Sequence, residues 1–191
     1  MFKVGINDTV AAGYTCKGRE FRLWQAMMAR CYSEYTKKVR PTYEGVTCQE
    51  SWKTFSLFIE DVSSMKGFDK MLTDGWVLDK DILVKGNKVY SKETCCFVPK
   101  EINGCFTLRK LHRGDCPVGV RQCSRSGKYI ARCGYDGRRR NLGHFTDVME
   151  AFIAYKACKE KEIKRLADKY KGLIDDSVCE ALYNYEVEID D

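Results

Sequence analysis

The chain of 191 residues is long enough for one domain or two small ones. Hydrophobic residues make up 44% of it and charged residues 31%, which is typical of a folded soluble protein. No apolar run approaches the ~20 residues that cross a bilayer, and the first residues lack the apolar core of a secretory signal. We therefore expect a globular protein of the cytoplasm with no membrane partner.

The cysteines also favour a reducing compartment. There are eleven, an odd number, with an adjacent pair at Cys95 and Cys96 and no Cys-x-x-Cys spacing. Disulfide frameworks usually show an even count in a short chain, and structural zinc sites usually show paired cysteines. Most of these cysteines occupy apolar positions, where a free thiol behaves as a small hydrophobic side chain. We expect free thiols and no zinc.

The net charge of +6 is unevenly distributed along the chain. Residues 107–145 hold ten Lys or Arg against two Asp, a local balance of +8. Residues 173–191 hold seven acidic residues and no basic one. The basic block predicts a polyanionic partner, whereas the acidic segment is a candidate contact for a protein partner.

Two helices are predicted in the first third of the chain. Apolar residues recur at helical spacing over residues 20–32, and this stripe is expected to be buried. Thr47 followed by Glu50 is a capping-box pattern that predicts a second helix, with an apolar stripe that runs to Val62. Both helices would supply the apolar wall that a small neighbouring motif needs. The basic segment 37–40 could contact phosphate, but a solvated loop is the preferred interpretation.

Residues 76–99 predict a compact unit of two strands and a short helix. Their apolar residues form two runs, and the polar connection between them contains Gly86-Asn87, a turn signal. The first run covers 76–78 and resumes at 82–84, and the second covers 95–98. Pro99 suits the first position of a helix, which predicts a short helix over 100–103.

This predicted unit resembles the core of HNH endonucleases, in the divergent form found in phage-encoded homing-type enzymes. The resemblance implies one divalent cation, Mg²⁺ or Mn²⁺, held against the scissile phosphate. It assigns cation binding to Asp79 and places Asn87 at the middle asparagine, which orients the general-base histidine or the loop. Lys80 stands where that histidine belongs, and Thr94 stands where the closing His or Asn ligand is expected.

Two interpretations of this departure are open. In the first, Asp79 and Asp81 hold the cation because alternate residues of a strand share one face, with Glu93 as a further candidate. Lys80 is then a phosphate-binding cation, since a lysine pKa of about 10.4, with two aspartates beside it, disfavours a role as base at pH 7. In the second, residues 79–81 form a solvated strand end with neutralising charges.

A base could also come from elsewhere in the chain. The only histidines are His112 and His144. The alternative for both is a surface histidine, packed in part against Phe145 in the case of His144.

The second half of the chain predicts three strands and one long helix. The strand candidates are 118–121, 128–133 and 138–145, separated by Ser126-Gly127 and Asp136-Gly137. Asp-Gly is a strong signal for a hairpin. Thr146 is expected to cap the helix, whose apolar positions form one stripe.

Three antiparallel strands backed by one amphipathic helix resemble an AP2 DNA-binding domain. The resembling residues are Gly119-Val120, Tyr129-x-Ala131, Gly137-Arg-Arg-Arg-x-Leu-Gly-x-Phe145, Glu150-Ala151-Phe152 and Ala154-Tyr155. The resemblance implies that the exposed face of the sheet enters the major groove of double-stranded DNA. The candidate DNA-binding residues are Arg121, Arg125, Lys128, Arg132, Arg138, Arg139 and Arg140. For Arg139 a solvated sheet edge is the preferred interpretation.

The predicted fold class is α+β, in four segments. These are an HNH-like domain at 1–106, a basic linker at 107–116, an AP2-like domain at 117–171 and an acidic tail at 172–191. Apolar residues at helical spacing in the tail predict a short helix docked on the body.

Three functions are open. The first is a metal-dependent phage-type endonuclease that reads its site through the AP2-like sheet. The second is a catalytically inactive DNA-binding or regulatory protein on a decayed HNH scaffold. The third is an interaction protein that acts through the acidic tail. The retained Asp79, Asp81 and Asn87 favour the first, and the missing histidine favours the second.

Overall fold

The structure is a computed structural model that describes residues 4–106 and 115–191. It confirms the predicted α+β class. The chain forms two compact units, one of residues 1–103 with 173–178 and one of residues 104–172 with 179–191. Within the described ranges, no helix combines the length and apolar content needed to cross a bilayer. All eleven cysteines are free thiols.

The first unit is built around α1, Arg19–Tyr32, as the helical spacing predicts. Its apolar stripe is buried, and Trp24 packs edge-on against Phe55 with ring centroids 5.8 Å apart. The indole of Trp24 also donates a hydrogen bond to the carbonyl of Trp52 at 2.8 Å. The other helices of this unit are α2, Glu34–Val39, η1, Pro41–Tyr43, η2, Glu50–Lys53, α3, Phe55–Ser63, and α4, Phe68–Thr73.

The capping box expected at Thr47 is wrong, because its residues pair with a distant strand. Thr47–Cys48 form β1, which pairs in parallel with β3, Val89–Tyr90. The backbone N–H of Thr47 donates to the carbonyl of Lys88 at 2.9 Å. The α-helix begins eight residues later, at Phe55. Pairing across about 40 residues thus overrides the local signal.

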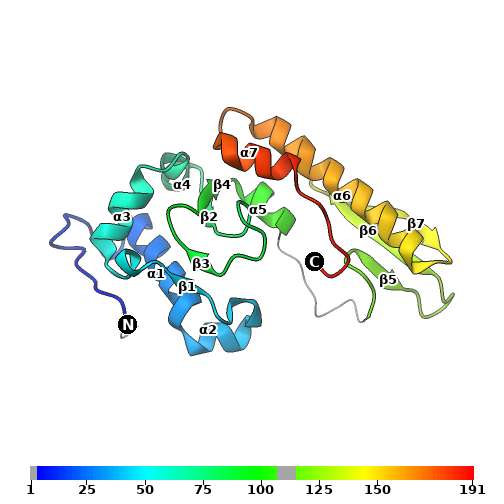
Figure 1. Cartoon of the computed structure of the whole chain (residues 1–191), viewed down its shortest axis with the longest axis horizontal. Helices are drawn as coiled ribbons and strands as arrows, with labels where there is room; N and C mark the ends of the chain where they lie inside the picture. The colour runs from blue at the N-terminus through cyan, green and yellow to red at the C-terminus, as the bar shows by residue number, and fades with distance from the viewer. Residues whose placement is uncertain (1–3, 107–114) are drawn as a thin grey trace. The chain divides into compact units, whose positions relative to one another are not determined.

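Residues 77–106 form the two expected strands and the helix, with a further short strand, β3, between the two strands (Figure 1). β2, Val77–Asp79, pairs antiparallel with β4, Cys96–Val98, and α5, Lys100–Phe106, follows. The first strand is shorter than expected, because residues 82–84 belong to the loop. In that loop Ile82 is buried.

The second unit is a three-stranded antiparallel sheet packed on one long helix (Figure 1). The strands are β5, Val120–Gln122, β6, Tyr129–Tyr135, and β7, Arg138–Phe145, in the order β5-β6-β7, and the helix is α6, Val148–Tyr170. Asp136 and Gly137 both adopt positive φ, at 51° and 69°, and form the predicted tight turn between β6 and β7. The helix cap is Asp147 rather than the expected Thr146: its carboxylate accepts the N–H groups of Met149 and Glu150 at 2.7 and 2.9 Å.

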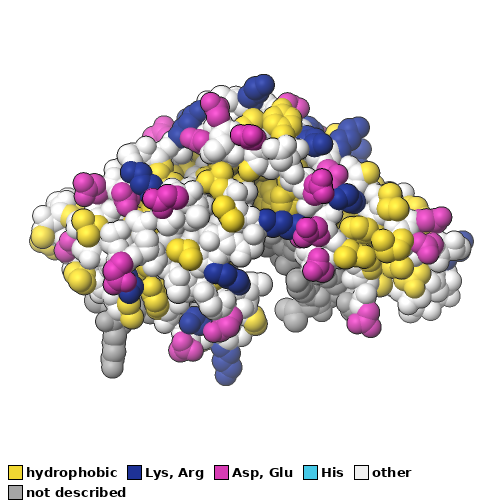
Figure 2. All heavy atoms as spheres, in the orientation of Figure 1, with side chains coloured by type: hydrophobic (Ala, Val, Ile, Leu, Met, Phe, Trp, Pro, Cys, Tyr) yellow, Lys and Arg dark blue, Asp and Glu magenta, His cyan; other side chains and the backbone are white. Residues whose placement is uncertain are grey.

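One face of the sheet and α6 enclose the core of this unit. Its centre contains Val120, Ala131 and Cys133 from the strands with Ala151, Phe152 and Tyr155 from the helix. Gly119 has φ +75°, and a Cβ there would lie 2.0 Å from the Tyr155 ring, so no other residue fits. The outer side of α6 is partly apolar: hydrophobic side chains gather over it in Figure 2, and Met149 and Ile153 are exposed.

The acidic C-terminal segment contains the expected helix. α7, Asp176–Tyr183, has buried Val178 and Leu182 on its apolar side. Residues 173–178 belong to the first unit and 179–191 to the second, so the segment is part of both units. Val187 lies in the core between sheet and α6, and its N–H donates to the Glu160 carboxylate at 3.0 Å.

Candidate functional site

Asp79 is the last residue of β2 and begins the loop that joins β2 to β3. Its Oδ1 accepts the backbone N–H groups of Asp81 at 2.7 Å and Ile82 at 3.0 Å, an Asx-type turn that ends the strand. The described residues donate no hydrogen bond to Oδ2. Burial raises the pKa of the Asp79 carboxyl, against the lowering effect of the two N–H groups. A partly buried carboxylate with one oxygen unengaged can ligate a cation.

Lys80 lies inside the loop, contrary to its expected role as a phosphate-binding cation. Its side chain is only 6% exposed, and the ammonium group reaches Asp81 Oδ1 at 2.5 Å. A second hydrogen bond goes to the carbonyl of Asn87 at 2.6 Å. These two acceptors hold the charge in place, so Lys80 stabilises the loop.

Asn87 closes the same loop from the other side. Its Nδ2 donates to the carbonyls of Lys80 at 2.8 Å and Val89 at 2.7 Å, and its Oδ1 accepts the Val89 N–H at 3.0 Å. These bonds fix the path of the chain on either side of the loop. The HNH role of Asn87 stays a prediction.

Asp81 does not share a strand face with Asp79, because the strand ends at Asp79. Its carboxylate is 46% exposed and carries the ion pair with Lys80. No group of three or more His, Cys, Asp or Glu side chains among the described residues is arranged to hold a metal ion. Mg²⁺ nevertheless needs only one or two carboxylates, because it keeps several of its waters. Asp79 fits one such ligand, and the exposed carboxylate of Asp81 pairs with Lys80 through Oδ1 alone.

The other residues considered near this loop have separate places. Thr94 Oγ1 donates to the carbonyl of Val89 at 2.8 Å and contacts Ser91 Oγ at 3.0 Å, so it stabilises the turn before β4. Glu93 is exposed. His144 lies in β7, in the second unit, and His112 is outside the described residues.

Arg30 is a residue that sequence reasoning missed. Its guanidinium donates to the Tyr90 hydroxyl at 3.2 Å and lies 5.8 Å from the centre of the Tyr43 ring. Burial lowers its pKa, but Tyr90, Tyr43 and the carboxylate of Asp79 outweigh that effect and raise it. The available signal was its helical spacing with Leu23 and Met27, which places a cation at the margin of an apolar stripe.

Strand register decides which basic residues of the second unit face outward. Cross-strand partners share a face of a sheet. The row Val120, Ala131 and Gly143 faces α6, so the adjacent row of Arg121, Ile130 and His144 lies on the other face, which we call the open face. Arg121 and His144 are exposed there, whereas Ile130 is 3% exposed. A bulge at residue 142 shifts the register of β7. On the side of the bulge towards the β6–β7 turn, Arg132 pairs with Asn141 and Gly134 with Arg139. The open face thus carries Arg121, Arg132 and Arg139.

The same register places Arg138 and Arg140 on the side of α6. Arg140 pairs with the buried Cys133, and Arg138 pairs with Tyr135. The guanidinium of Arg140 lies 4.3 Å from the centre of the Tyr135 ring, a cation–π contact. Arg139, expected at a solvated edge, is therefore better placed on the open face than either neighbour.

Arg125 and Lys128 lie in the connection between β5 and β6 and are exposed. None of the seven candidate basic residues forms an ion pair with a described residue. Their charges are consequently uncompensated within that part of the chain and available to a polyanion.

Comparisons of the chain with models of protein families, with curated proteins and with solved structures found no match.

Proposed function

We propose that this protein binds double-stranded DNA through the open face of β5, β6 and β7. The observation that carries the proposal is the common orientation of Arg121, Arg132 and Arg139, one from each strand, on the side of the sheet away from α6. All three lack an ion-pair partner among the described residues. The resemblance to the AP2 fold supports the same face.

The physical chemistry of the surface suits a duplex. Arginine makes two parallel hydrogen bonds to a phosphate or to the O6 and N7 atoms of guanine. The rigid sheet fixes the spacing of the three guanidinium groups, since the opposite face is anchored on α6. Exposed Arg125 and Lys128, in the connecting turn, would add phosphate contacts at the margin.

The test is equilibrium binding of the full chain to a fluorescent duplex over a range of salt concentrations. The logarithm of the binding constant should fall linearly with the logarithm of the salt concentration. The steepness of this fall, which we call the salt slope, is proportional to the number of phosphates contacted. Arg121→Ala and Arg132→Ala should each cost ~1–3 kcal/mol if they contact bases, or reduce the salt slope by about one if they contact phosphate. Lys161→Ala, in the exposed middle of α6, is the matched control. Equal losses in all three variants would contradict the proposal.

A second candidate function is metal-dependent cleavage of a phosphodiester bond beside Asp79. It is supported by the unengaged Oδ2 of Asp79 and by the loop that Lys80 and Asn87 hold in one conformation. A bound Mg²⁺ or Mn²⁺ would stabilise the negative charge that develops on the phosphate. Asp79 would position that cation, and the hydrogen bonds of Asn87 would hold the loop in its conformation. The buried Lys80 supplies no base, which favours the alternative of a DNA-binding protein that does not cut.

Nicking of a supercoiled plasmid distinguishes these alternatives. If the protein cuts, Asp79→Asn should abolish cleavage while leaving duplex binding intact, and His144→Ala should leave cleavage intact. A loss of cleavage in His144→Ala, with binding preserved, would instead assign the base to β7. No cleavage with Mg²⁺ or Mn²⁺ by the unaltered chain would support the DNA-binding protein alone.

A further inference from the structure

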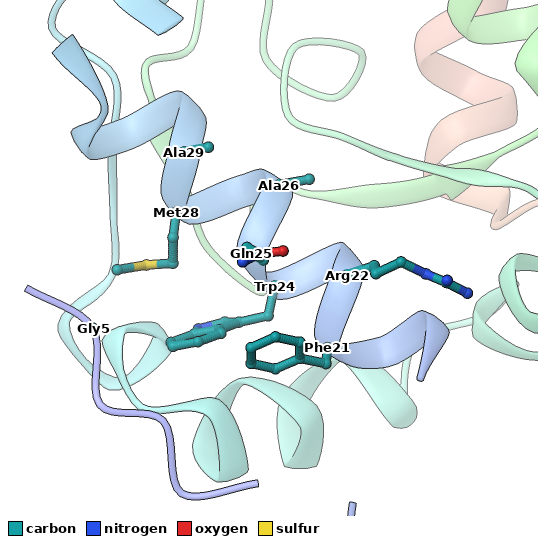
Figure 3. A pocket seen from close by; sticks show the side chains of 8 residues that line it. All are labelled: Gly5, Phe21, Arg22, Trp24, Gln25, Ala26, Met28 and Ala29. Carbon is teal, nitrogen blue, oxygen red and sulfur yellow. The ribbon is translucent and has the colours of Figure 1, made fainter. Parts of the chain in front are cut away.

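Two hollows lie beside α1 in the first unit. One, of about 550 Å³, is lined largely by apolar side chains, including Phe21, Trp24 and Met28 (Figure 3). The other, of about 520 Å³, lies between α1 and the segment 71–78, and we call it the basic groove. Figure 3 shows the Arg22 side chain extending away from the two aromatic rings, and Arg22 lines both hollows.

The basic groove holds a local excess of positive charge. Its cationic lining residues are Arg19, Arg22, Arg30 and Lys100. Asp74 is the acidic residue among those that line it, and its carboxylate pairs with Lys70 at 3.3 Å. In the described ranges the side chains of Arg22 and Lys100 have neither an ion pair nor a hydrogen bond. An anionic ligand would therefore meet two unengaged cations.

The other two cations are fixed before any ligand arrives. Arg19 donates to the carbonyl of Leu72, and Arg30 donates to the Tyr90 hydroxyl at 3.2 Å. A guanidinium has five N–H donors, so each retains several for a ligand. Because these side chains are already ordered, binding would cost little of their rotamer entropy.

The spacing of the cations suits a chain of phosphates better than a single one. Arg19, Arg22 and Arg30 occupy one face of α1, and eleven residues of helix rise about 16 Å. One DNA strand rises about 3.4 Å for each phosphate, so the groove is as long as roughly five nucleotides. A free phosphate or a mononucleotide would engage only part of it.

The basic groove also leads towards Asp79. Its wall includes Val77 and Leu78 of β2, the strand that ends at Asp79. Arg30 lies within electrostatic reach of the Asp79 carboxylate. A strand lying in the groove would bring a phosphodiester to the loop that begins at this residue.

We propose that the basic groove binds the sugar–phosphate backbone of the DNA strand that passes Asp79. This inference rests on the proposed binding of duplex DNA and adds a second contact surface, in the first unit. The surface reads no sequence, because phosphate contacts position the protein and base contacts specify the site.

The experiment compares two double variants of the full chain with equal loss of charge. Arg22→Ala with Lys100→Ala removes the two unengaged cations of the groove. Lys38→Ala with Arg40→Ala removes two exposed cations from the same unit outside it. In duplex binding over a salt series, the groove variant should lower the salt slope by about two and weaken binding to every sequence alike. The control variant should keep the slope of the unaltered protein, and Arg22→Lys should retain most of it.

The possible failures are distinguishable. If the unaltered chain binds duplex DNA and the two double variants bind equally well, the groove inference is overturned and the sheet proposal stands. If the unaltered chain binds no duplex, both fall. Pyrophosphate provides a further test in the Arg121→Ala and Arg132→Ala variants of the sheet. If pyrophosphate at micromolar concentration displaces the duplex from these variants, the inference is also overturned, because the groove would then be a site for a small phosphate ligand.

Discussion

Lys80 and Asn87 exchange two hydrogen bonds across the loop that follows β2. The Lys80 ammonium donates to the Asn87 carbonyl at 2.6 Å, and the Asn87 side-chain amide donates to the Lys80 carbonyl at 2.8 Å. Each residue thus satisfies the backbone of the other. The position where the HNH resemblance places a general base is occupied here by a side chain that builds the loop.

Replacing Asn87 with Ala should destabilise the first unit. The change removes three hydrogen bonds and leaves the Lys80 carbonyl without its donor. The expected loss is ~1–3 kcal/mol in the free energy of unfolding, measured by urea denaturation. Asn184→Ala, at an exposed position, is the control and should stay within about 0.5 kcal/mol of the unaltered protein. Equal effects would contradict the role assigned to Asn87.

Replacing Lys80 with Met should also destabilise the protein, by ~1–3 kcal/mol, because the Asn87 carbonyl and the Asp81 carboxylate lose their common donor. Lys80→His tests whether the general base is the one group that the candidate cleavage site lacks. A gain of plasmid nicking in Lys80→His, with no gain in Lys80→Met, would show that the remaining site is intact. A stable Lys80→Met variant would contradict the structural role of the ammonium group.

The stability of the protein should depend on the ionisation of Asp79. Burial raises the folded-state pKa of Asp79 above its unfolded value of about 3.9, so the folded state holds this proton more tightly. The contribution of Asp79 to stability is then fully present at low pH. It declines as the pH rises from the unfolded-state pKa through the folded-state pKa.

Asp79→Asn keeps an acceptor for the N–H groups of Asp81 and Ile82 and removes this ionisation. The variant should therefore gain stability relative to the unaltered protein as the pH rises above about 4. Thermal unfolding at pH 3.5 and pH 7 without divalent cations measures the difference. If Asp79→Asn instead loses stability relative to the unaltered protein as the pH rises, the direction given for the Asp79 pKa is contradicted.

Arg138 and Arg139 form a matched pair of neighbours on opposite faces of β7. Register places Arg139 on the open face with Gly134, and Arg138 beside Tyr135 on the side of α6. Arg139→Ala should weaken duplex binding by ~1–3 kcal/mol or lower its salt slope by about one, while Arg138→Ala should have a smaller effect. A larger loss in Arg138→Ala would show that DNA approaches the other side of the hairpin.

The acidic segment should matter for stability and leave DNA affinity unchanged. Leu182 is 1% exposed and Val187 3% exposed, so Leu182→Ala should cost ~2–5 kcal/mol and Val187→Ala about 2 kcal/mol. Ile189→Ala, at a position 45% exposed, is the control. Calorimetry and duplex titration test the two expectations together. Tighter binding in a variant of unchanged stability would indicate that the segment competes with DNA.

The sequence by itself determined the elements whose signals lie in consecutive residues. The apolar spacing of α1, the Asp136-Gly137 turn between β6 and β7 and the amphipathic α6 all form as expected. Helical periodicity and turn chemistry act over a few residues, and at these three elements no distant pairing overrides them, unlike at Thr47. The tail helix α7 follows the same rule.

Only the tertiary structure decided the placement of individual functional side chains. Thr47 pairs with a strand about 40 residues away, which no local pattern encodes. Lys80 turns inward because Asp81 and the Asn87 carbonyl together compensate the desolvation of its charge. The bulge at residue 142 of β7 reverses the faces on which Arg138, Arg139 and Arg140 lie, since side chains alternate with a period of two. Arg30 comes within electrostatic reach of Asp79 only in the tertiary structure, because the two residues lie about 50 positions apart in the chain.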